Sequence, residues 1–406
     1  MINEQESNVA KAVKAAVMRR VVESGAFVIP DISADTGLSV TTVSKYVSQM
    51  VENGEIEALE VVSSDKRGRR PVLYGVRSDT SRFACVDVRQ YGVSYGLMDI
   101  SGKMIAEYSD SEFVYENSPA RLEELCVGLE SFVMDRCHLT MRNIRSVCFC
   151  LGGRINTFSG TSASKFTLES LADTPLAEYL TERLGTDVFV ENDTKAMTYG
   201  EYLSLGNRTW KNVLFVNIGW GLGIGIVIDG KLYYGKDGYS GELGHAPIYD
   251  NDIICHCGKK GCLETEVSGS AIHRRLLERI KGGESSRLSP KYYRGEMISL
   301  SDIMSAAGKE DPLCVDLITK VGTELGRSIS MLINVFSPDC IILGGDVSQA
   351  ASYYFLYPLQ ASVRKYSLRL ISQNLPFVTS RLGDRAAIYG GCMLARNRHF
   401  TSEIHE

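Results

Sequence analysis

"GELGHAPIYDNDIICHCGKKGCLE", residues 241–264, holds three of the eleven cysteines of the chain and two of its six histidines. The cysteines follow the spacing C-x-C-x4-C, and His245 lies ten residues before the first of them. The glycines at positions 258 and 261 allow the chain to fold back between these residues. One nitrogen and three sulfur donors form a closed tetrahedral set, which is typical of structural zinc sites. We therefore predict one structural Zn²⁺ per chain, held by His245, Cys255, Cys257 and Cys262.

Two other interpretations of this stretch stay open. The cysteines could be core thiols, but the stretch is too polar for a buried strand, and a metal can supply the folding energy that such a loop lacks. His256 could be the nitrogen ligand, although a residue between two ligands usually points away from them. Cys148 and Cys150, by contrast, alternate on an apolar β-like run, and we expect them in the core.

The composition is that of a globular protein with several domains. A chain of 406 residues with 44% hydrophobic residues predicts about two or three domains. The first twenty residues do not resemble a signal peptide, and no run approaches the roughly eighteen apolar residues that span a bilayer. We therefore expect a cytoplasmic protein without membrane insertion and without disulfides. The net charge of −5 argues against general coating of nucleic acid, but it allows a local DNA-reading patch.

Residues 1–80 predict a winged helix-turn-helix domain. The segment 31–56 reads as a short helix, a turn at Gly37 and a second helix with Ser39 as its N-cap. The apolar positions expected on the second helix are Val40, Val43, Val47 and Met50. Two β-like runs, 57–62 and 71–76, are joined by "SSDKRGRR" at 63–70, which indicates a hairpin with a basic tip.

This domain carries residues that suit DNA. Short polar side chains and one cation on the second helix would face a major groove, and the basic tip suits phosphates or a narrow minor groove. The predicted contacts to operator DNA are Thr41, Thr42, Ser44, Lys45, Tyr46, Lys66, Arg67, Arg69 and Arg70. The alternative is a helical hairpin with a solvated loop. It stays open because residues 1–82 carry eleven basic and eleven acidic groups, and so have no overall excess of positive charge for binding DNA.

From Phe83 onward β-like runs alternate with helical stretches, which indicates an α/β architecture. A weak internal repeat relates residues 83–105 to residues 214–234, with Asp87 in the place of Asn217. Two facing lobes of this kind predict a ligand site where the lobes meet. The alternative is two unrelated hairpins, since hairpins are common.

Four motifs in this order resemble those of the ROK family, named for repressors, open reading frames and sugar kinases. They are "VENDTKA" at 190–196, "SGELGH" at 240–245, the C-x-C-G-x-x-G-C-x-E loop, and "PDCIILGGDVS" at 338–348. With a helix-turn-helix ahead of them, the chain is most similar to the NagC/XylR-like transcriptional repressors. The resemblance implies an actin-like, two-lobed sugar kinase fold after the N-terminal domain. We expect a small lobe at 81–191 and 385–406 and a large lobe at 192–384.

The resemblance also implies a sugar site. The residues that match the sugar-contacting motifs of the family are Gly152, Gly153, Asn192, Asp193, Glu242, His245 and Glu264. Carboxylates and an amide suit this role because they offer several acceptors and donors to neighbouring hydroxyls. His245 could bind zinc with one nitrogen and a sugar hydroxyl with the other. In ROK kinases the residue matching Asp193 is the general base.

The phosphate loops depart from those of the kinases. The first loop, Asp-x-Gly-Gly-Thr in the kinases, reads Asp-Val-Arg-Gln-Tyr at 87–91 here. Those glycines let backbone N–H groups approach phosphate, and bulky side chains replace them. The second loop keeps its glycines at 219–223 but carries Trp220, while Gly344 and Gly345 match the adenosine-side turn. We therefore do not expect ATP as a cofactor or competent kinase activity.

These features together predict a sugar-responsive repressor. A monosaccharide or a sugar derivative would bind between the lobes and change the affinity for operator DNA. We expect a homodimer or homotetramer, because two half-sites are needed for useful specificity. The alternatives are an ATP-dependent sugar kinase with an added DNA-binding domain, and a protein partner acting as the effector.

Overall fold

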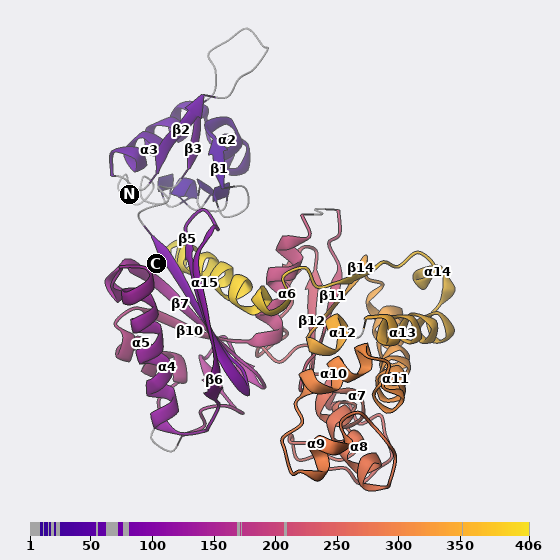
Figure 1. The fold of residues 1–406 in the computed structure, drawn as a ribbon. Helices are drawn as coiled ribbons and strands as arrows, with labels where there is room; N and C mark the ends of the chain where they lie inside the picture. The colour runs from indigo at the N-terminus through magenta and orange to yellow at the C-terminus, as the bar shows by residue number, and fades with distance from the viewer. Residues whose placement is uncertain are drawn as a thin grey trace. The chain divides into compact units, whose positions relative to one another are not determined.

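The computed structural model divides the chain into unit 1, residues 1–193 with 388–406, and unit 2, residues 194–387 (Figure 1). The structure describes residues 9–10, 12–14, 16–17, 20–21, 25–53, 56–61, 72–75, 81–168, 171, 173–206, 209–350 and 352–405. None of the helices in this part of the chain is both long and apolar enough to cross a bilayer.

The N-terminal elements are two helices and a small antiparallel sheet of order β1-β3-β2. They are β1 (Ala26–Val28), α2 (Ile29–Thr36), α3 (Val40–Glu52), β2 (Glu57–Val61) and β3 (Val72–Gly75). As predicted, Ser39 caps α3, because its Oγ accepts a hydrogen bond from Thr42 N at 3.1 Å. Val43, Val47 and Met50 are buried, as expected.

One expectation for this region is wrong, and another concerns residues outside the described part of the chain. Val40 is 53% exposed, so the expectation that it lies on the apolar face is wrong. It is the first residue of α3 and precedes the first buried residue of the helix, Val43. The predicted tip residues Lys66, Arg67, Arg69 and Arg70 lie outside the described residues.

Unit 1 contains a mixed sheet of order β10-β7-β4-β5-β6. Its strands are β4 (Arg82–Val88), β5 (Tyr91–Asp99), β6 (Met104–Val114), β7 (Ile144–Leu151) and β10 (Asp187–Asn192). β4 is antiparallel to β5 and parallel to β7. A two-stranded ribbon of β8 (Ile155–Asn156) and β9 (Thr161–Ser162) follows β7.

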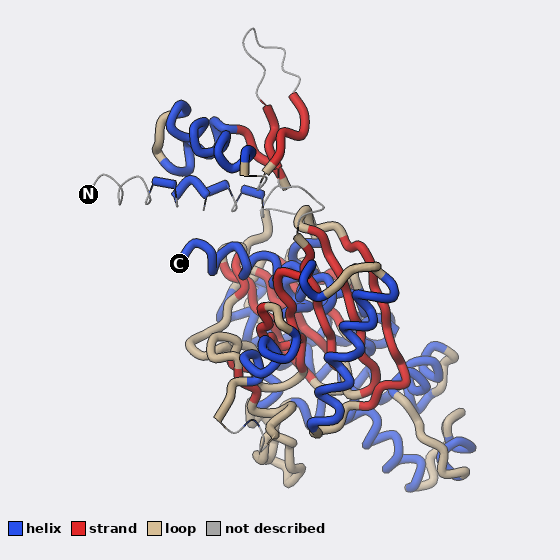
Figure 2. The backbone as a smooth tube through the Cα atoms, turned by 90° about the vertical axis from the view of Figure 1, so that its left-hand side faces the viewer, coloured by secondary structure: helices blue, strands red, loops and turns tan. Residues whose placement is uncertain are grey.

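Helices cover both faces at the centre of this sheet, so that β4, β5 and β7 are mostly buried, whereas the edge strand β6 is largely exposed. Ala84 and Val86 pack with α4 (Pro119–Ser131) and α5 (Leu176–Leu184), which lie alongside the strands in Figures 1 and 2. On the other face α15 (Ala386–His405) comes so close that a Cβ on Gly391 would lie 2.3 Å from Cys85 Sγ. Cys148 and Cys150 are fully buried, as expected for core residues.

Unit 2 contains a second mixed sheet, of order β13-β12-β11-β14-β15. Its strands are β11 (Val213–Ile218), β12 (Leu222–Ile228), β13 (Lys231–Leu232), β14 (Cys340–Gly344) and β15 (Phe377–Thr379). Met197 and Tyr202 of α6 (Asp193–Ser204) pack on one face around Phe215. The helices of the larger core and its margin are α7 (Glu264–Val267), α8 (Gly269–Lys281), α9 (Ser289–Tyr293), α10 (Leu300–Gly308), α11 (Pro312–Phe336), α12 (Asp346–Ala350), α13 (Ser352–Tyr366) and α14 (Arg369–Ser372).

The two sheets repeat one topology. In each, the first strand is central, the second and third follow it antiparallel, and the fourth and fifth extend the other side in parallel. The repeated sequences 83–105 and 214–234 begin this pattern in their respective units. The interpretation as two unrelated hairpins is therefore wrong, because the strand order matches well beyond the hairpins.

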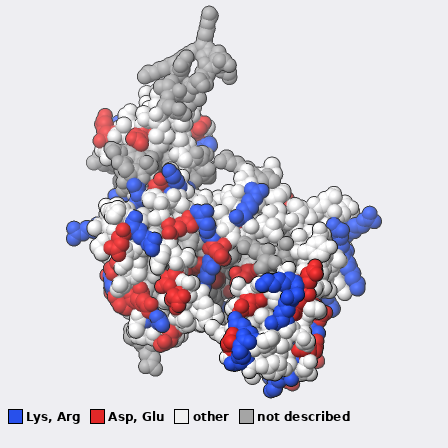
Figure 3. All heavy atoms as spheres, in the orientation of Figure 1, with Lys and Arg blue, Asp and Glu red and all other residues white. Residues whose placement is uncertain are grey.

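Charged side chains of both signs are interspersed over the face shown in Figure 3. This distribution agrees with a net charge of only −5 for the whole chain. The described residues on that face show no broad field of one sign.

Candidate metal centre and sugar-binding residues

The predicted zinc ligands come together in unit 2. His245 ends a short 3-10 turn, Leu243–His245, and the three cysteines lie on the loop that follows. Turn hydrogen bonds shape that loop: Gly258 N donates to Cys255 O at 2.8 Å, and Tyr249 N donates to Gly261 O at 3.0 Å. Gly261 has a φ of +73°, and a Cβ there would lie 2.0 Å from Tyr249 O, so only glycine suits this position.

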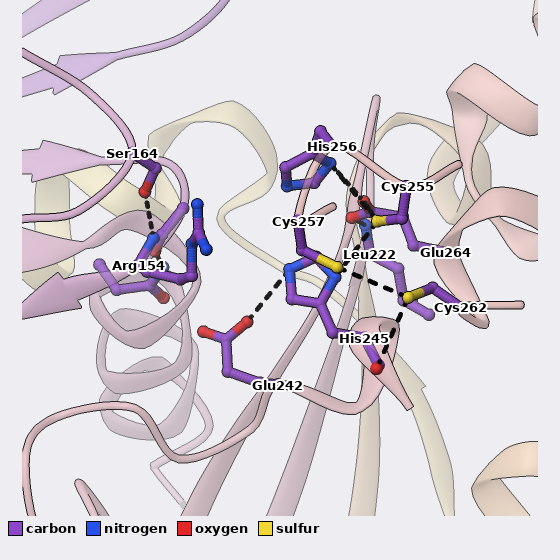
Figure 4. Close-up of polar contacts among 12 residues, drawn as sticks. Arg154, Ser164, Leu222, Glu242, His245, Cys255, His256, Cys257, Cys262 and Glu264 are labelled. Carbon is purple, nitrogen blue, oxygen red and sulfur yellow. Dashed lines mark hydrogen bonds and ion pairs between the residues drawn. The ribbon is translucent and has the colours of Figure 1, made fainter. Parts of the chain in front are cut away.

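The donor atoms have the spacing of a tetrahedral site (Figure 4). His245 and the three cysteines place one donor each within 4.8 Å of one another. Cys255 Sγ lies 3.5 Å from His245 Nδ1, and Cys257 Sγ lies 3.6 Å from Cys262 Sγ. Bonds of 2.3 Å to sulfur and 2.0–2.1 Å to nitrogen require edges of about 3.8 Å between sulfurs and about 3.6 Å between sulfur and nitrogen. The arrangement can therefore hold a metal ion.

The two candidate histidines differ in their surroundings. His245 turns Nδ1 toward the sulfurs and Nε2 toward Glu242 Oε2, 3.5 Å away, as in a carboxylate–histidine–metal arrangement. The His256 ring is 59% exposed, and its Nδ1 lies 3.0 Å from Glu264 Oε1 and 3.8 Å from Cys255 Sγ. These positions favour His245 as the nitrogen ligand and His256 as a partner of Glu264.

Glu264 connects the metal loop to the sheet of unit 2. It is the first residue of α7, and its Oε2 accepts a hydrogen bond from Leu222 N, at the start of β12, at 3.0 Å. Burial raises the pKa of Glu264, but the hydrogen bonds from His256 and from Leu222 N–H outweigh it, so the pKa is lowered overall. Glu264 is therefore a fixed, ionised acceptor beside the cysteines.

The other predicted sugar residues come together in unit 1. Asn192 ends β10, and its Nδ2 donates to Gly153 O at 2.9 Å. Asp193 begins α6, and its Oδ2 lies 3.1 Å from where a Cβ on Gly152 would be. The seven expected residues thus form two groups: these four in unit 1, and Glu242, His245 and Glu264 in unit 2.

The turn that corresponds to the first phosphate loop is closed by its own contacts. Arg89 N donates to Gly92 O at 3.1 Å, and Arg89 Nε donates to Asp87 Oδ2 at 2.8 Å. Burial raises the pKa of Asp87, although the Arg89 charge opposes this shift. The Arg89 backbone N–H is used within the hairpin, so this amide is not directed at phosphate.

Sequence reasoning missed two cations beside the Gly152–Gly153 loop. Arg154 follows the loop directly, and Lys165 hydrogen-bonds to Val88 O at the end of β4. The signal available in the sequence was a basic residue on each side of the β8–β9 ribbon. Those two residues could not be connected with the Gly152–Gly153 loop until the structure showed that the ribbon folds back on it.

The sequence model of the ROK family matches residues 84–398, most of the chain. The chain belongs to the ROK family. Its fold is the actin-like sugar-kinase type of that family, with mixed α/β sheets, as expected. The chain is 27% identical to the "DNA-binding transcriptional dual regulator NagC" of Escherichia coli K12, over 94% of this chain and 92% of that protein.

Two further relatives show how far the similarity extends. The crystal structure of a ROK family transcriptional regulator, a homolog of the E. coli Mlc protein, is 27% identical, has a TM-score of 0.79 and covers 98% of both chains. A glucokinase of Halalkalibacterium halodurans is 31% identical, but over only 57% of this chain and 70% of that protein. The likeness to regulators thus extends through the N-terminal elements.

Proposed function

We propose that this protein is a sugar-responsive transcriptional repressor. The similarity to transcriptional regulators over 94% and 98% of the chain carries this proposal, because it includes the residues ahead of the family domain at 84–398. The glucokinase likeness covers a smaller part. A repressor needs a DNA-reading module in addition to a sugar-binding one, and this chain has room for both.

The N-terminal elements support a winged helix-turn-helix. α2 and α3 flank a turn, and β2 and β3 form the antiparallel pair that a wing requires. Val43, Val47 and Met50 bury one side of α3, while Thr41 and Lys45 are exposed and Thr42, Ser44 and Tyr46 are partly exposed. We propose α3 as the recognition helix, with the basic tip at 66–70 contacting the phosphate backbone.

We further propose that the metal is Zn²⁺ with a structural role. Three thiolates and an imidazole make a soft, closed donor set that suits zinc. Bound zinc would fasten the loop that carries Glu264, and Glu242 beside His245 Nε2 would orient the imidazole. The residues expected from the family would hold the hydroxyls of a monosaccharide effector.

A kinase is the less supported alternative. Asp193 is present, but phosphoryl transfer depends on positioning and charge stabilisation of the phosphates more than on the base. The Arg89–Asp87 ion pair and the hydrogen bond from Arg89 N–H fill the turn where the kinases hold phosphate. We therefore propose no role for ATP.

The test is operator binding by fluorescence anisotropy with DNA from upstream of the gene, against a panel of hexoses, pentoses, amino sugars and their phosphates. We expect at least one sugar to change operator affinity. Asp193→Ala should abolish that response and leave the affinity without sugar unchanged. Asp187→Ala, which changes an exposed carboxylate at the start of β10, the strand that leads into Asp193, should respond normally. Sugar-dependent ATP turnover at about 1–10³ s⁻¹, abolished by Asp193→Ala, would instead establish a kinase.

A further inference from the structure

Lys165 is fixed firmly beside the Gly152–Gly153 loop in unit 1. Its Nζ donates to Val88 O at 3.0 Å and lies 4.5 Å from the centre of the Tyr115 ring, within cation–π range. Its backbone N donates to Ser162 Oγ at 3.0 Å. The next residue, Phe166, donates its N–H to Tyr115 OH at 3.1 Å and packs edge-on against the same ring. The ammonium group is therefore held in one place before any ligand arrives.

The position that a Cβ of Gly152 would take, called here the gap above Gly152, lies between this lysine and Asp193. A Cβ on Gly152 would lie 3.1 Å from Asp193 Oδ2 and 3.8 Å from Lys165 Cε. Gly152 does not have a positive φ, so its backbone conformation does not require glycine. The absence of a side chain at Gly152 instead leaves space between the Asp193 carboxylate and the Lys165 side chain.

Lys165 and Arg154 both have N–H groups that donate to no acceptor within the described residues. An ammonium has three N–H groups, and within the described residues the Lys165 ammonium has one hydrogen-bond acceptor, Val88 O, and one aromatic face. Arg154 Nη2 donates to Ala163 O at 3.3 Å, but Arg154 Nε is buried and has no hydrogen-bond partner in the described part of the chain. A buried donor without an acceptor is unfavourable, so a ligand oxygen there would relieve a cost.

We infer that Lys165 and Arg154 are effector-binding residues in addition to those expected from the family. Lys165 donates a charge-assisted hydrogen bond to a sugar oxygen in the gap above Gly152, where Asp193 accepts from a hydroxyl. Arg154 Nε donates to a second oxygen of the same ligand. The inference rests on the proposed function. The shared ligand chemistry is an oxygen acceptor, which either a neutral hydroxyl or an acidic substituent of the sugar can supply.

The experiment is isothermal titration calorimetry of the full chain with the sugar that changes operator affinity. Lys165→Met should weaken sugar binding by about tenfold to a hundredfold, the range for a hydrogen bond to a charged group, and Lys165→Arg should recover part of the loss. Gly152→Ala should weaken binding comparably, because its methyl group fills the gap. Operator affinity without sugar should stay unchanged in all three variants.

The control variant is Tyr115→Phe. It removes the hydroxyl that holds Phe166 N–H but keeps the ring against Lys165, so it should lower thermal stability more than sugar affinity. A loss of affinity as large as that of Lys165→Met would show that Lys165 only fastens the loop, and would overturn the inference. Unchanged sugar binding by Lys165→Met would overturn it as well.

Two arms identify the source of the ligand oxygen. A loss in Lys165→Met and Arg154→Gln that is larger for a sugar phosphate or sugar acid than for the parent sugar would assign an acidic substituent. Equal losses would assign a hydroxyl. If no sugar of either kind binds the wild-type protein, the proposed function fails and this inference with it, whereas normal binding by the variants defeats this inference alone.

Discussion

The positions of individual nitrogen and sulfur atoms determine whether the cysteine loop can bind a metal ion. His245 and His256 have their rings 5.0 Å apart. His245 Nδ1 lies 3.5 Å from Cys255 Sγ and its Nε2 meets Glu242, whereas His256 Nδ1 is 3.8 Å from the same sulfur and closer to Glu264. The sequence predicted His245 and left His256 as a rival ligand, because spacing along the chain does not reveal side-chain direction.

Cys257→Ser is expected to bind no zinc and to have a lower melting temperature than the wild-type protein, because a serine hydroxyl does not ionise at neutral pH and metal binding contributes folding energy. Zinc per chain is counted by plasma mass spectrometry, and stability is followed by calorimetry. His245→Ala should behave in the same way, whereas His256→Ala should keep its zinc. Full occupancy in Cys257→Ser, or loss of zinc only in His256→Ala, would contradict the proposed ligand set.

At the scale of elements, α15 is the last helix in the sequence, but it packs on the sheet of unit 1 with the order β10-β7-β4-β5-β6. Ser146 Oγ on β7 donates to Ala395 O at 3.0 Å, and Arg396 Nη1 donates to Ile100 O at 3.2 Å. Gly391 allows this helix to lie directly on the sulfurs of Cys85 and Cys150. The close approach of helix to sheet depends on the absence of a side chain there.

Gly391→Ala is therefore expected to destabilise the protein by about 1–3 kcal/mol, the usual cost of overpacking a core. The matched control is Gly308→Ala at the end of α10, where a Cβ would meet no atom within 4 Å. That change should be neutral or stabilising by up to about 1 kcal/mol, because alanine favours a helix over glycine. Urea unfolding followed by circular dichroism compares the two, and equal stability would refute the packing of α15 described above.

For the whole molecule, specific repression requires more than one copy of the DNA-reading domain. One recognition helix contacts only a few base pairs, so we expect a homo-oligomer that binds an inverted repeat. The wild-type protein should bind the intact repeat far more tightly than an isolated half-site. Analytical ultracentrifugation with and without DNA gives the number of chains bound.

Replacing Arg67, Arg69 and Arg70 together with alanine should weaken operator binding and reduce the slope of log affinity against log salt by about 2 to 3, close to one per lost phosphate contact. Lys236, Lys309 and Lys320 are exposed on unit 2, and their triple alanine variant makes the same change in net charge. That control should keep the salt slope. An unchanged slope in the arginine variant would remove the hairpin tip from the DNA interface.

Much of the protein could be predicted from local pattern. The C-x-C-x4-C spacing predicted a cysteine cluster that can hold a metal, the Ser39 cap marked the start of α3, and the repeat at 83–105 and 214–234 marked the central strands of both sheets. Each of these depends on residues close in sequence, where spacing and turn chemistry constrain geometry directly.

Other features needed distant segments to be brought together. Lys165 is held by contacts with Val88 and Tyr115, about 80 and 50 residues away in the chain. It comes near Asp193 because both residues lie beside Gly152. The burial of Arg154 Nε likewise depends on the β8–β9 ribbon folding back. The sequence by itself therefore determined the family, the cysteine cluster of the candidate metal centre and the strand pattern, because these lie in local motifs. Only the tertiary structure decided how each histidine lies relative to the sulfurs and which cations flank the Gly152–Gly153 loop, because packing between distant segments sets the direction of a side chain.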